Sequence, residues 1–110
     1  MRKQQSVMFD IDDTLISSRT NRNIQWVVDL LNRCRKQGFR IVIVTARPSF
    51  PTNVNWTYKQ LKDHGIHYDE LWFCPAEMKG KAKRDSGYNF WLSVGDQPTD
   101  LTDSTYSIKV

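Results

Sequence analysis

The chain has only two cysteines and two histidines among its 110 residues, so it offers few ligands for zinc and few partners for disulfides. Cys34 and Cys74 lie far apart and lack the spacing of metal ligands, and we expect both to be reduced thiols. His64 and His67 lie close together, but no other histidine or cysteine near them completes a zinc set. These absences argue against a zinc finger and against a disulfide-rich fold.

Long apolar runs, repeats and low-complexity segments are also absent. No run reaches the roughly 18 apolar residues that a membrane helix requires, so no membrane partner is expected. The first six residues are polar and basic and are not followed by the apolar centre of a signal peptide, which predicts a soluble, intracellular and cytoplasmic protein. The length and the lack of a linker predict one domain spanning residues 1–110.

Basic residues outnumber acidic ones, giving a net charge of +4 and an isoelectric point near 9.2. They cluster at residues 33–36 and 79–84. Such clusters attract phosphorylated metabolites or nucleic acid. The alternative is a solvated helix face, which is the favoured interpretation for the first cluster.

Strand-like and helix-like segments alternate along the chain. The predicted strands are residues 6–11, 40–45, 70–73, 89–94 and 106–110, and the predicted helices are residues 23–36, 53–64 and 80–85. The near-continuous β-branched run at 40–45 is typical of a strand covered on both faces. The alternation predicts an α/β fold, a three-layer Rossmann-like arrangement with a mostly parallel central sheet and helices on both faces.

Polar residues stand at the carboxyl ends of three predicted strands, where ligands bind in such sheets. Asp10 and Asp12 end the first, Thr45 ends the second, and Asp96 follows the fourth. Strand alternation sends Asp10 and Asp12 to the same side. Clustered carboxylates resist ionising together unless a cation joins them, and an oxygen-only set suits Mg²⁺. One aspartate is then available to attack phosphorus, while a second transfers protons.

The polar strand ends carry a family resemblance. The segment 10–14, "DIDDT", resembles motif I (Asp-x-Asp-x-Thr) of the haloacid dehalogenase-like (HAD) phosphatases. The segment 41–47, "IVIVTAR", resembles motif II, and 91–100, "WLSVGDQPTD", resembles motif IV. The likeness covers about residues 7–103. The segments "FDIDDTL", "TARP" and "VGDQPTDL" are most similar to the acid-phosphatase-like branch.

The resemblance implies a role for each acidic residue. Asp10 is the expected nucleophile and a metal ligand. Asp12 is the expected general acid and base, and its backbone carbonyl is a metal ligand. Asp96 is expected to bind Mg²⁺. Asp100 is expected to support the ion indirectly, by contacting its ligands or through a water molecule. Asp13 stands at a variable position of the motif and is not expected to take part in catalysis.

Other roles follow from the later motifs. Thr45 is expected to bind the phosphoryl group. Lys79 matches best the lysine that orients the nucleophile and the phosphoryl group, and Lys81 is the alternative. Arg47 is either a substrate-binding residue that grips a phosphate or a solvated loop residue.

The aromatic residues and Cys34 are interpreted mainly as core. Cys34 lies on the apolar face of the first helix. The four tryptophans are mostly core candidates. Trp56 follows the proline-bearing loop after motif II, so the alternative is that it lines the cleft and stacks on a base.

A second aspartate in motif I favours phosphoester hydrolysis, so the expected activity is a Mg²⁺-dependent phosphomonoesterase with an aspartyl-phosphate intermediate. The segments between the motifs are too short to hold a cap domain. By analogy, a capless core accepts large phosphorylated substrates, such as a nucleic-acid end, or closes its site with a partner subunit, as a homo-oligomer does. The alternatives are an inactive HAD-fold binding or regulatory module and a phosphotransferase.

Overall fold

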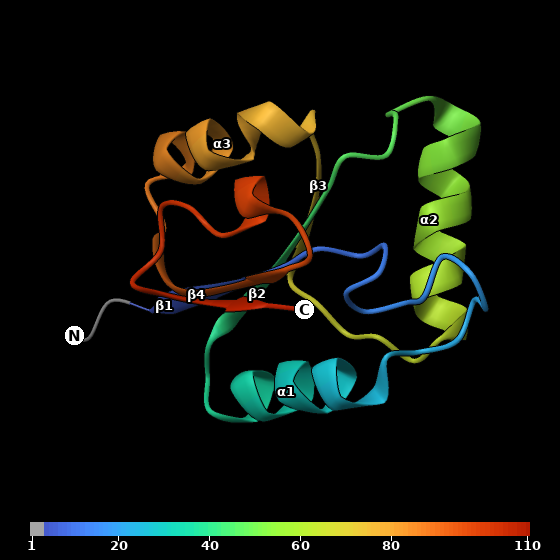
Figure 1. The fold of residues 1–110 in the computed structure, drawn as a ribbon, viewed down its shortest axis with the longest axis horizontal. Coiled ribbons are helices and arrows are strands. Elements are labelled where there is room, and N and C mark those ends of the chain that lie inside the picture. The colour runs from blue at the N-terminus through green and yellow to red at the C-terminus, as the bar shows by residue number, and fades with distance from the viewer. Residues whose placement is uncertain (1–3) are drawn as a thin grey trace.

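The computed structural model describes residues 4–110 and is built on one five-stranded sheet (Figure 1). In chain order the elements are β1 Gln5–Phe9, α1 Gln25–Lys36, β2 Arg40–Thr45, α2 Pro51–Asp63, β3 Glu70–Phe73, the 3₁₀ helix η1 Ala76–Met78, α3 Lys79–Ser86, β4 Asn89–Gly95, the 3₁₀ helix η2 Pro98–Asp100 and β5 Tyr106–Lys109. All the strand pairs are parallel, in the order β3-β2-β1-β4-β5. The predicted α/β fold is confirmed.

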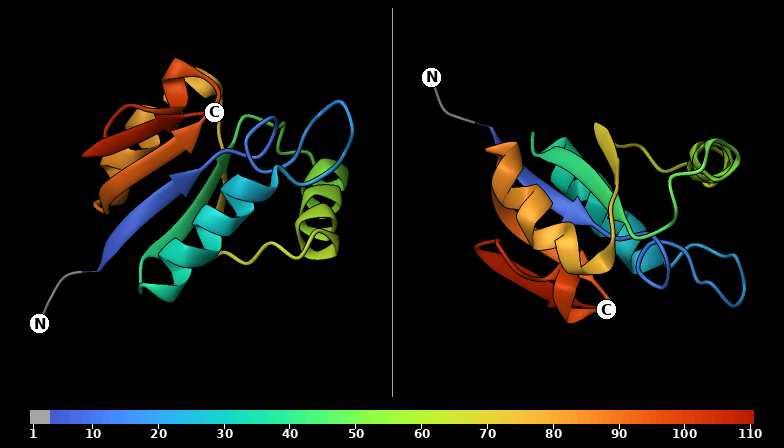
Figure 2. Two further views of the ribbon diagram at one scale, coloured as in Figure 1. Left: turned by 60° about the horizontal axis from the view of Figure 1, so that its bottom comes forward. Right: turned by 90° about the horizontal axis from the view of Figure 1, so that it is seen from above.

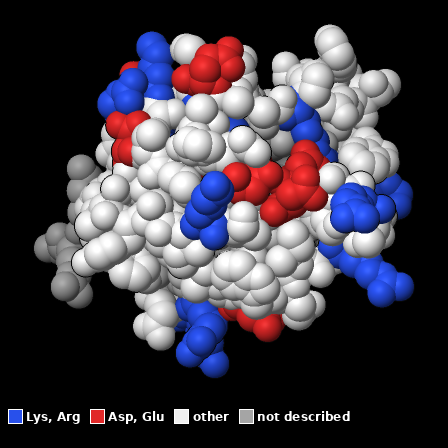
Figure 3. Space-filling view, in the orientation of Figure 1, with Lys and Arg blue, Asp and Glu red and all other residues white. Residues whose placement is uncertain are grey.

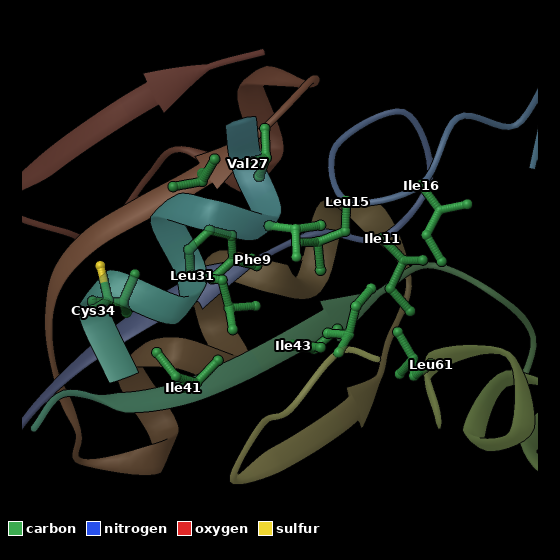
Figure 4. Close-up of a cluster of buried hydrophobic side chains, with 14 of the residues drawn as sticks. Phe9, Ile11, Leu15, Ile16, Val27, Leu31, Cys34, Ile41, Ile43 and Leu61 are labelled. Carbon is green, nitrogen blue, oxygen red and sulfur yellow. The ribbon is translucent and has the colours of Figure 1, made fainter. Parts of the chain in front are cut away.

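Helices cover both faces of the sheet. Figures 1 and 2 show α1 on one face, α3 on the other, and α2 set apart to one side. Alternate residues of β1 supply the two apolar layers: Val7 and Phe9 pack with the residues of α1, while Met8 packs with Val42 and Phe90. Figure 4 shows the larger cluster, in which Leu31 of α1 lies against the sheet. Burial on both faces explains the continuous apolar strands.

The strand order reverses beside β1, because β1 leads to β2 on one side while the chain returns from β3 to β4 on the other. Ligands in open parallel sheets bind at the carboxyl ends of the strands at such a reversal. Asp10 follows β1 and Asp96 follows β4, so the fold itself puts these two residues at that point.

β1 ends at Phe9, two residues earlier than predicted. The Asp10 amide still bonds to the Val94 carbonyl at 3.1 Å, and the chain then turns so that three following amides donate to the Ile11 carbonyl. Neither Asp10 nor Asp12 belongs to the strand, so strand alternation does not set the directions of their side chains, as the prediction assumed. The turn aims the two carboxylates at different partners.

All three helix starts also differ from the prediction. α1 begins at Gln25 rather than at residue 23. α2 begins at Pro51 rather than at residue 53, because the fixed φ of proline suits the first helical position. α3 begins at Lys79 rather than at residue 80, directly after η1. The added turn ahead of α3 brings Lys79 to the helix start.

The tryptophans divide between two environments. Trp72 and Trp91 are half-buried, and Trp91 stacks on Phe39 at 4.9 Å between ring centroids. Trp26 and Trp56 are 52% and 54% exposed, so the core prediction is wrong for both. Trp26 is not among the α1 residues that face the core, which are Val27, Val28, Leu31 and Cys34. Cys34 is therefore buried, as predicted. Among residues 4–110, every helix is too short or too polar to cross a bilayer.

Candidate active site

A cleft of about 320 Å³ opens at the carboxyl ends of the central strands. We call it the acidic cleft, and its wall includes Asp10, Asp12, Arg47, Lys79, Asp96 and Asp100. Figure 3 shows acidic side chains gathered on this side of the molecule with lysine or arginine on either flank. Six of the seven candidate site residues thus share one depression, although they come from four separate stretches of the chain.

Lys79 lies between two carboxylates. Its ammonium is 3.0 Å from Asp10 Oδ1 and 2.6 Å from Asp100 Oδ1, and all three side chains are almost fully buried. Burial lowers the pKa of Lys79, but the charges and hydrogen bonds of Asp10 and Asp100 raise it by more, so the net shift of the pKa is upward. Lys79 is therefore a fixed positive charge that holds the two aspartates in place.

The Asp10 carboxyl is hard to ionise in this environment. Burial raises the pKa of Asp10 to about 7, and the Asp100 charge adds to that rise, while the Lys79 ammonium opposes it. One ammonium is thus too little to balance the carboxylates in the cleft.

A divalent cation fits this imbalance. Oxygens of Asp10, Asp96 and Asp100 lie within 4.8 Å of one another, and the donor set contains oxygen alone. Gly95 makes the close packing possible, because a Cβ there would meet the Asp100 carboxyl at 2.4 Å. Asp100 is fixed further by the Gln97 amide, which donates to its Oδ2 at 3.1 Å. These residues fit Mg²⁺.

Asp12 does not join that group, since its carboxylate faces Arg47. The guanidinium donates to both oxygens, with Nε 3.0 Å from Oδ2 and Nη2 2.8 Å from Oδ1. Nη1 donates to Thr57 Oγ1 at 3.1 Å, so the fork is anchored on α2. The Arg47 side chain is only 11% exposed, which excludes the solvated-loop alternative. The arginine orients the expected general acid.

Thr45 is the one candidate site residue that does not line the acidic cleft. It is 1% exposed, and its hydroxyl accepts the Arg47 amide at 3.2 Å. Lys81, the alternative lysine, is exposed and pairs with Asp85 at 2.6 Å. Asp13 also lines the cleft, but its carboxylate accepts hydrogen bonds from the Ser18 amide and hydroxyl, which lower the pKa of Asp13.

Lys83 is a buried residue for which the sequence predicted no role. It is 1% exposed and donates to Ser93 Oγ at 3.1 Å, to the Asp100 carbonyl at 2.8 Å and to the Thr102 carbonyl. Burial lowers the pKa of Lys83 to about 8. The available signal was its spacing of four residues from Lys79, which puts both lysines on one face of α3.

The sheet and its acidic cleft have the form of a HAD-type phosphatase. A family model described as HAD superfamily, subfamily IIIB (acid phosphatase), matches residues 17–110. The chain belongs to this family, which confirms the predicted class. Motif I, with Asp10 and Asp12, precedes the matched range. No curated protein matches the chain.

Solved structures share the fold at low sequence identity. A chain of the Pnkp1/Rnl/Hen1 complex is 16% identical, with a TM-score of 0.82 over 100% of this chain and 47% of its own length. A chain of the Pnkp1/Rnl/Hen1 RNA repair complex is 16% identical, with a TM-score of 0.80 over 98% and 42%. Hypothetical protein PH1952 from Pyrococcus horikoshii OT3 is 15% identical, with a TM-score of 0.50 over 89% and 36%. This chain spans less than half the length of these structures.

Proposed function

We propose that the chain is a Mg²⁺-dependent phosphomonoesterase that forms an aspartyl-phosphate on Asp10, and that residues 1–110 make up its phosphatase domain. The observation that carries the proposal is the placement of Lys79 between Asp10 and Asp100 in a cleft at the reversal of strand order. A buried aspartate held by a buried lysine is an oriented nucleophile beside a charge that attracts phosphate.

The proposed reaction has two steps. Asp10 attacks phosphorus, and the bond to the leaving oxygen breaks as Asp12 gives that oxygen a proton. Water then attacks the phosphoryl group and gives a proton to Asp12, while the bond between phosphorus and the Asp10 oxygen breaks and inorganic phosphate leaves. The pair of bonds from Arg47 keeps the Asp12 carboxyl aimed during both transfers.

Charge stabilisation falls to the other residues of the site. Lys79 offsets the charge that develops on the phosphoryl oxygens. Thr45 accepts its hydrogen bond from the Arg47 amide, which leaves its hydroxyl proton for a phosphoryl oxygen. Because Thr45 is buried outside the cleft wall, this contact requires its hydroxyl to become exposed when the substrate binds. When held by Asp10, Asp96 and Asp100, Mg²⁺ supplies further positive charge for the same oxygens.

The intermediate provides the direct test. The protein is mixed with a ³²P-labelled phosphomonoester and Mg²⁺, quenched in acid, and separated from the substrate. We expect label on the wild-type protein that hydroxylamine releases, as an acyl-phosphate requires, and none on Asp10→Asn. Hydrolysis by the wild type with no labelled protein at any quench time would remove the aspartyl-phosphate from the proposal.

We propose further that the substrate is a large phosphorylated molecule, with a nucleic-acid end as the leading example. The support for this proposal is the open acidic cleft, the net charge of +4 and the likeness to a chain from an RNA repair complex. Activity on a 3′-phosphorylated oligonucleotide should fall steeply as salt increases, because phosphate contacts release counterions. Flat salt dependence together with a preference for small sugar phosphates would contradict it.

A further inference from the structure

A second pocket of about 420 Å³ adjoins the acidic cleft and shares Asp12 and Arg47 with it. We call it the Trp56 pocket. Its other wall includes Asn21 from the loop after motif I, together with Trp56 and Gln60 from α2. A substrate whose phosphate lies in the acidic cleft could therefore place the group next to that phosphate in the Trp56 pocket.

Trp56 gives this pocket an aromatic surface. Trp56 is 54% exposed, so much of this large side chain is accessible from the pocket side of α2. The Arg47 guanidinium carbon lies 5.1 Å from the centre of the indole ring, and Arg47 is itself fixed by Asp12 and Thr57. The ring is thus supported by a fixed neighbour, and its remaining exposed surface is available for stacking.

Gln60 lines this pocket and a neighbouring one, and it carries a polar atom that lacks a partner. The residue is 8% exposed, and its Nε2 donates to Asn21 Oδ1 at 2.9 Å. Its Oε1 is buried and accepts no hydrogen bond from any residue in 4–110. A buried acceptor without a donor is uncommon in folded proteins and calls for an explanation, such as a bound water, an ion or a functional role.

We propose that the Trp56 pocket binds the base of the nucleotide that carries the phosphate in the acidic cleft. A nucleobase has a flat π-face for Trp56 and N–H donors at its edge for Gln60 Oε1, whereas a sugar phosphate has no flat face. This proposal rests on the proposed phosphatase function, because it names the substrate of the same site. The chemistry is the same for a free nucleotide and for a nucleic-acid end.

Binding measured without turnover tests the pocket directly. The probes are fluorescent trinucleotides with a 3′-terminal phosphate, one with an intact terminal base and one with an abasic terminal nucleotide. In fluorescence anisotropy without Mg²⁺, we expect the intact probe to bind the wild type about tenfold tighter than the abasic probe. Trp56→Ala should lose most of this preference, and Trp56→Phe should keep part of it.

Trp26→Ala is the matched control, because Trp26 is 52% exposed but does not line the pocket. It should keep the full preference for the intact base. Gln60→Leu should lower the preference while leaving binding of the abasic probe unchanged. Equal binding of the two probes by the wild type, or an equal loss in the two alanine variants, would overturn the proposal.

Hydrolysis separates this inference from the proposed function. Hydrolysis of ribose phosphates by a wild type that shows no preference for a base would overturn the pocket and leave the phosphatase standing. A preference for the base that requires Trp56, in a protein that hydrolyses no phosphoester, would keep the pocket and overturn the phosphatase. Displacement of the probe by nucleoside monophosphates would show that one nucleotide is enough for binding. Displacement by oligonucleotides alone would show that neighbouring nucleotides add to the binding. Both outcomes support the pocket.

Discussion

The Lys79 ammonium lies 3.0 Å from Asp10 Oδ1, although 69 positions separate the two residues in the chain. β1 delivers Asp10 to the sheet edge, while η1 and the first turn of α3 bring Lys79 over it. The contact joins motif I with the lysine that the HAD resemblance assigns to the nucleophile. It also gives the buried carboxylate a positive partner, without which burial of its charge would be strongly unfavourable.

Asp10→Asn should lower phosphatase activity by at least about a thousandfold, because an amide oxygen is a poor nucleophile for phosphorus. The matched control is Asp13→Asn, since Asp13 is near the same cleft but bonds to Ser18. Asparagine also tolerates the positive φ of 59° at that position. Initial rates with Mg²⁺ measure both variants, and similar losses in the two would contradict the assignment.

Lys79→Met should destabilise the protein as well as inactivate it. The change leaves Asp10 and Asp100 buried without their ammonium, which costs about 3–5 kcal/mol in the absence of divalent cations. Lys81→Met removes an exposed pair with Asp85 and should stay within about 0.5 kcal/mol. Urea unfolding in a chelating buffer measures the difference. Equal stability of the two variants would show that the buried pair contributes nothing.

Local patterns were enough to predict the sheet. The predicted strands at 40–45 and 70–73 have the same bounds as β2 and β3, because an apolar run between turn residues marks both ends. The strand-end rule also predicted which polar residues would share an edge. What failed at β1 was the assumption that the strand continues through Asp10, where the turn onto the Ile11 carbonyl takes over.

Local patterns did not predict several contacts between side chains from distant segments. The pairing of Arg47 with Asp12 depends on a contact over 35 positions, and no local pattern encodes it. The exposure of Trp56 depends on the position of α2 beside the sheet, while residue type alone favours burial. Lys83 is buried only because the η2 loop supplies backbone carbonyls above it. These features depend on tertiary packing.

Without divalent cations, stability should decrease as pH rises from about 4 to about 7. The ordinary pKa of an aspartate is 3.8, whereas the pKa of Asp10 in the folded protein is about 7, so the folded state holds a proton that the unfolded chain has released. The free energy of unfolding therefore falls with pH over that interval. In thermal melts with chelator, Asp10→Asn should flatten the dependence of stability on pH. A pH dependence unchanged in the variant would show that another group causes it.

Mg²⁺ should raise the melting temperature at neutral pH, because an ion bound by Asp10, Asp96 and Asp100 stabilises the folded state alone. Asp96→Asn should lose most of this increase. Asp85→Asn is the control, since Asp85 pairs with Lys81 at the surface. An increase of the same size in all three proteins would place the binding of the ion outside the cleft.

Lys83→Met should lower the free energy of unfolding by about 2–4 kcal/mol. The variant leaves Ser93 Oγ and the carbonyls of Asp100 and Thr102 without their shared donor. The loss stays below the sum of three hydrogen bonds, because the methionine no longer buries a charge, a cost visible in the lowered pKa of Lys83. Lys81→Met is again the control.

Since the Asp100 carbonyl belongs to η2, Lys83→Met should also bind Mg²⁺ more weakly in melts at neutral pH. A variant with wild-type stability and wild-type Mg²⁺ response would show that the η2 loop holds its position without Lys83.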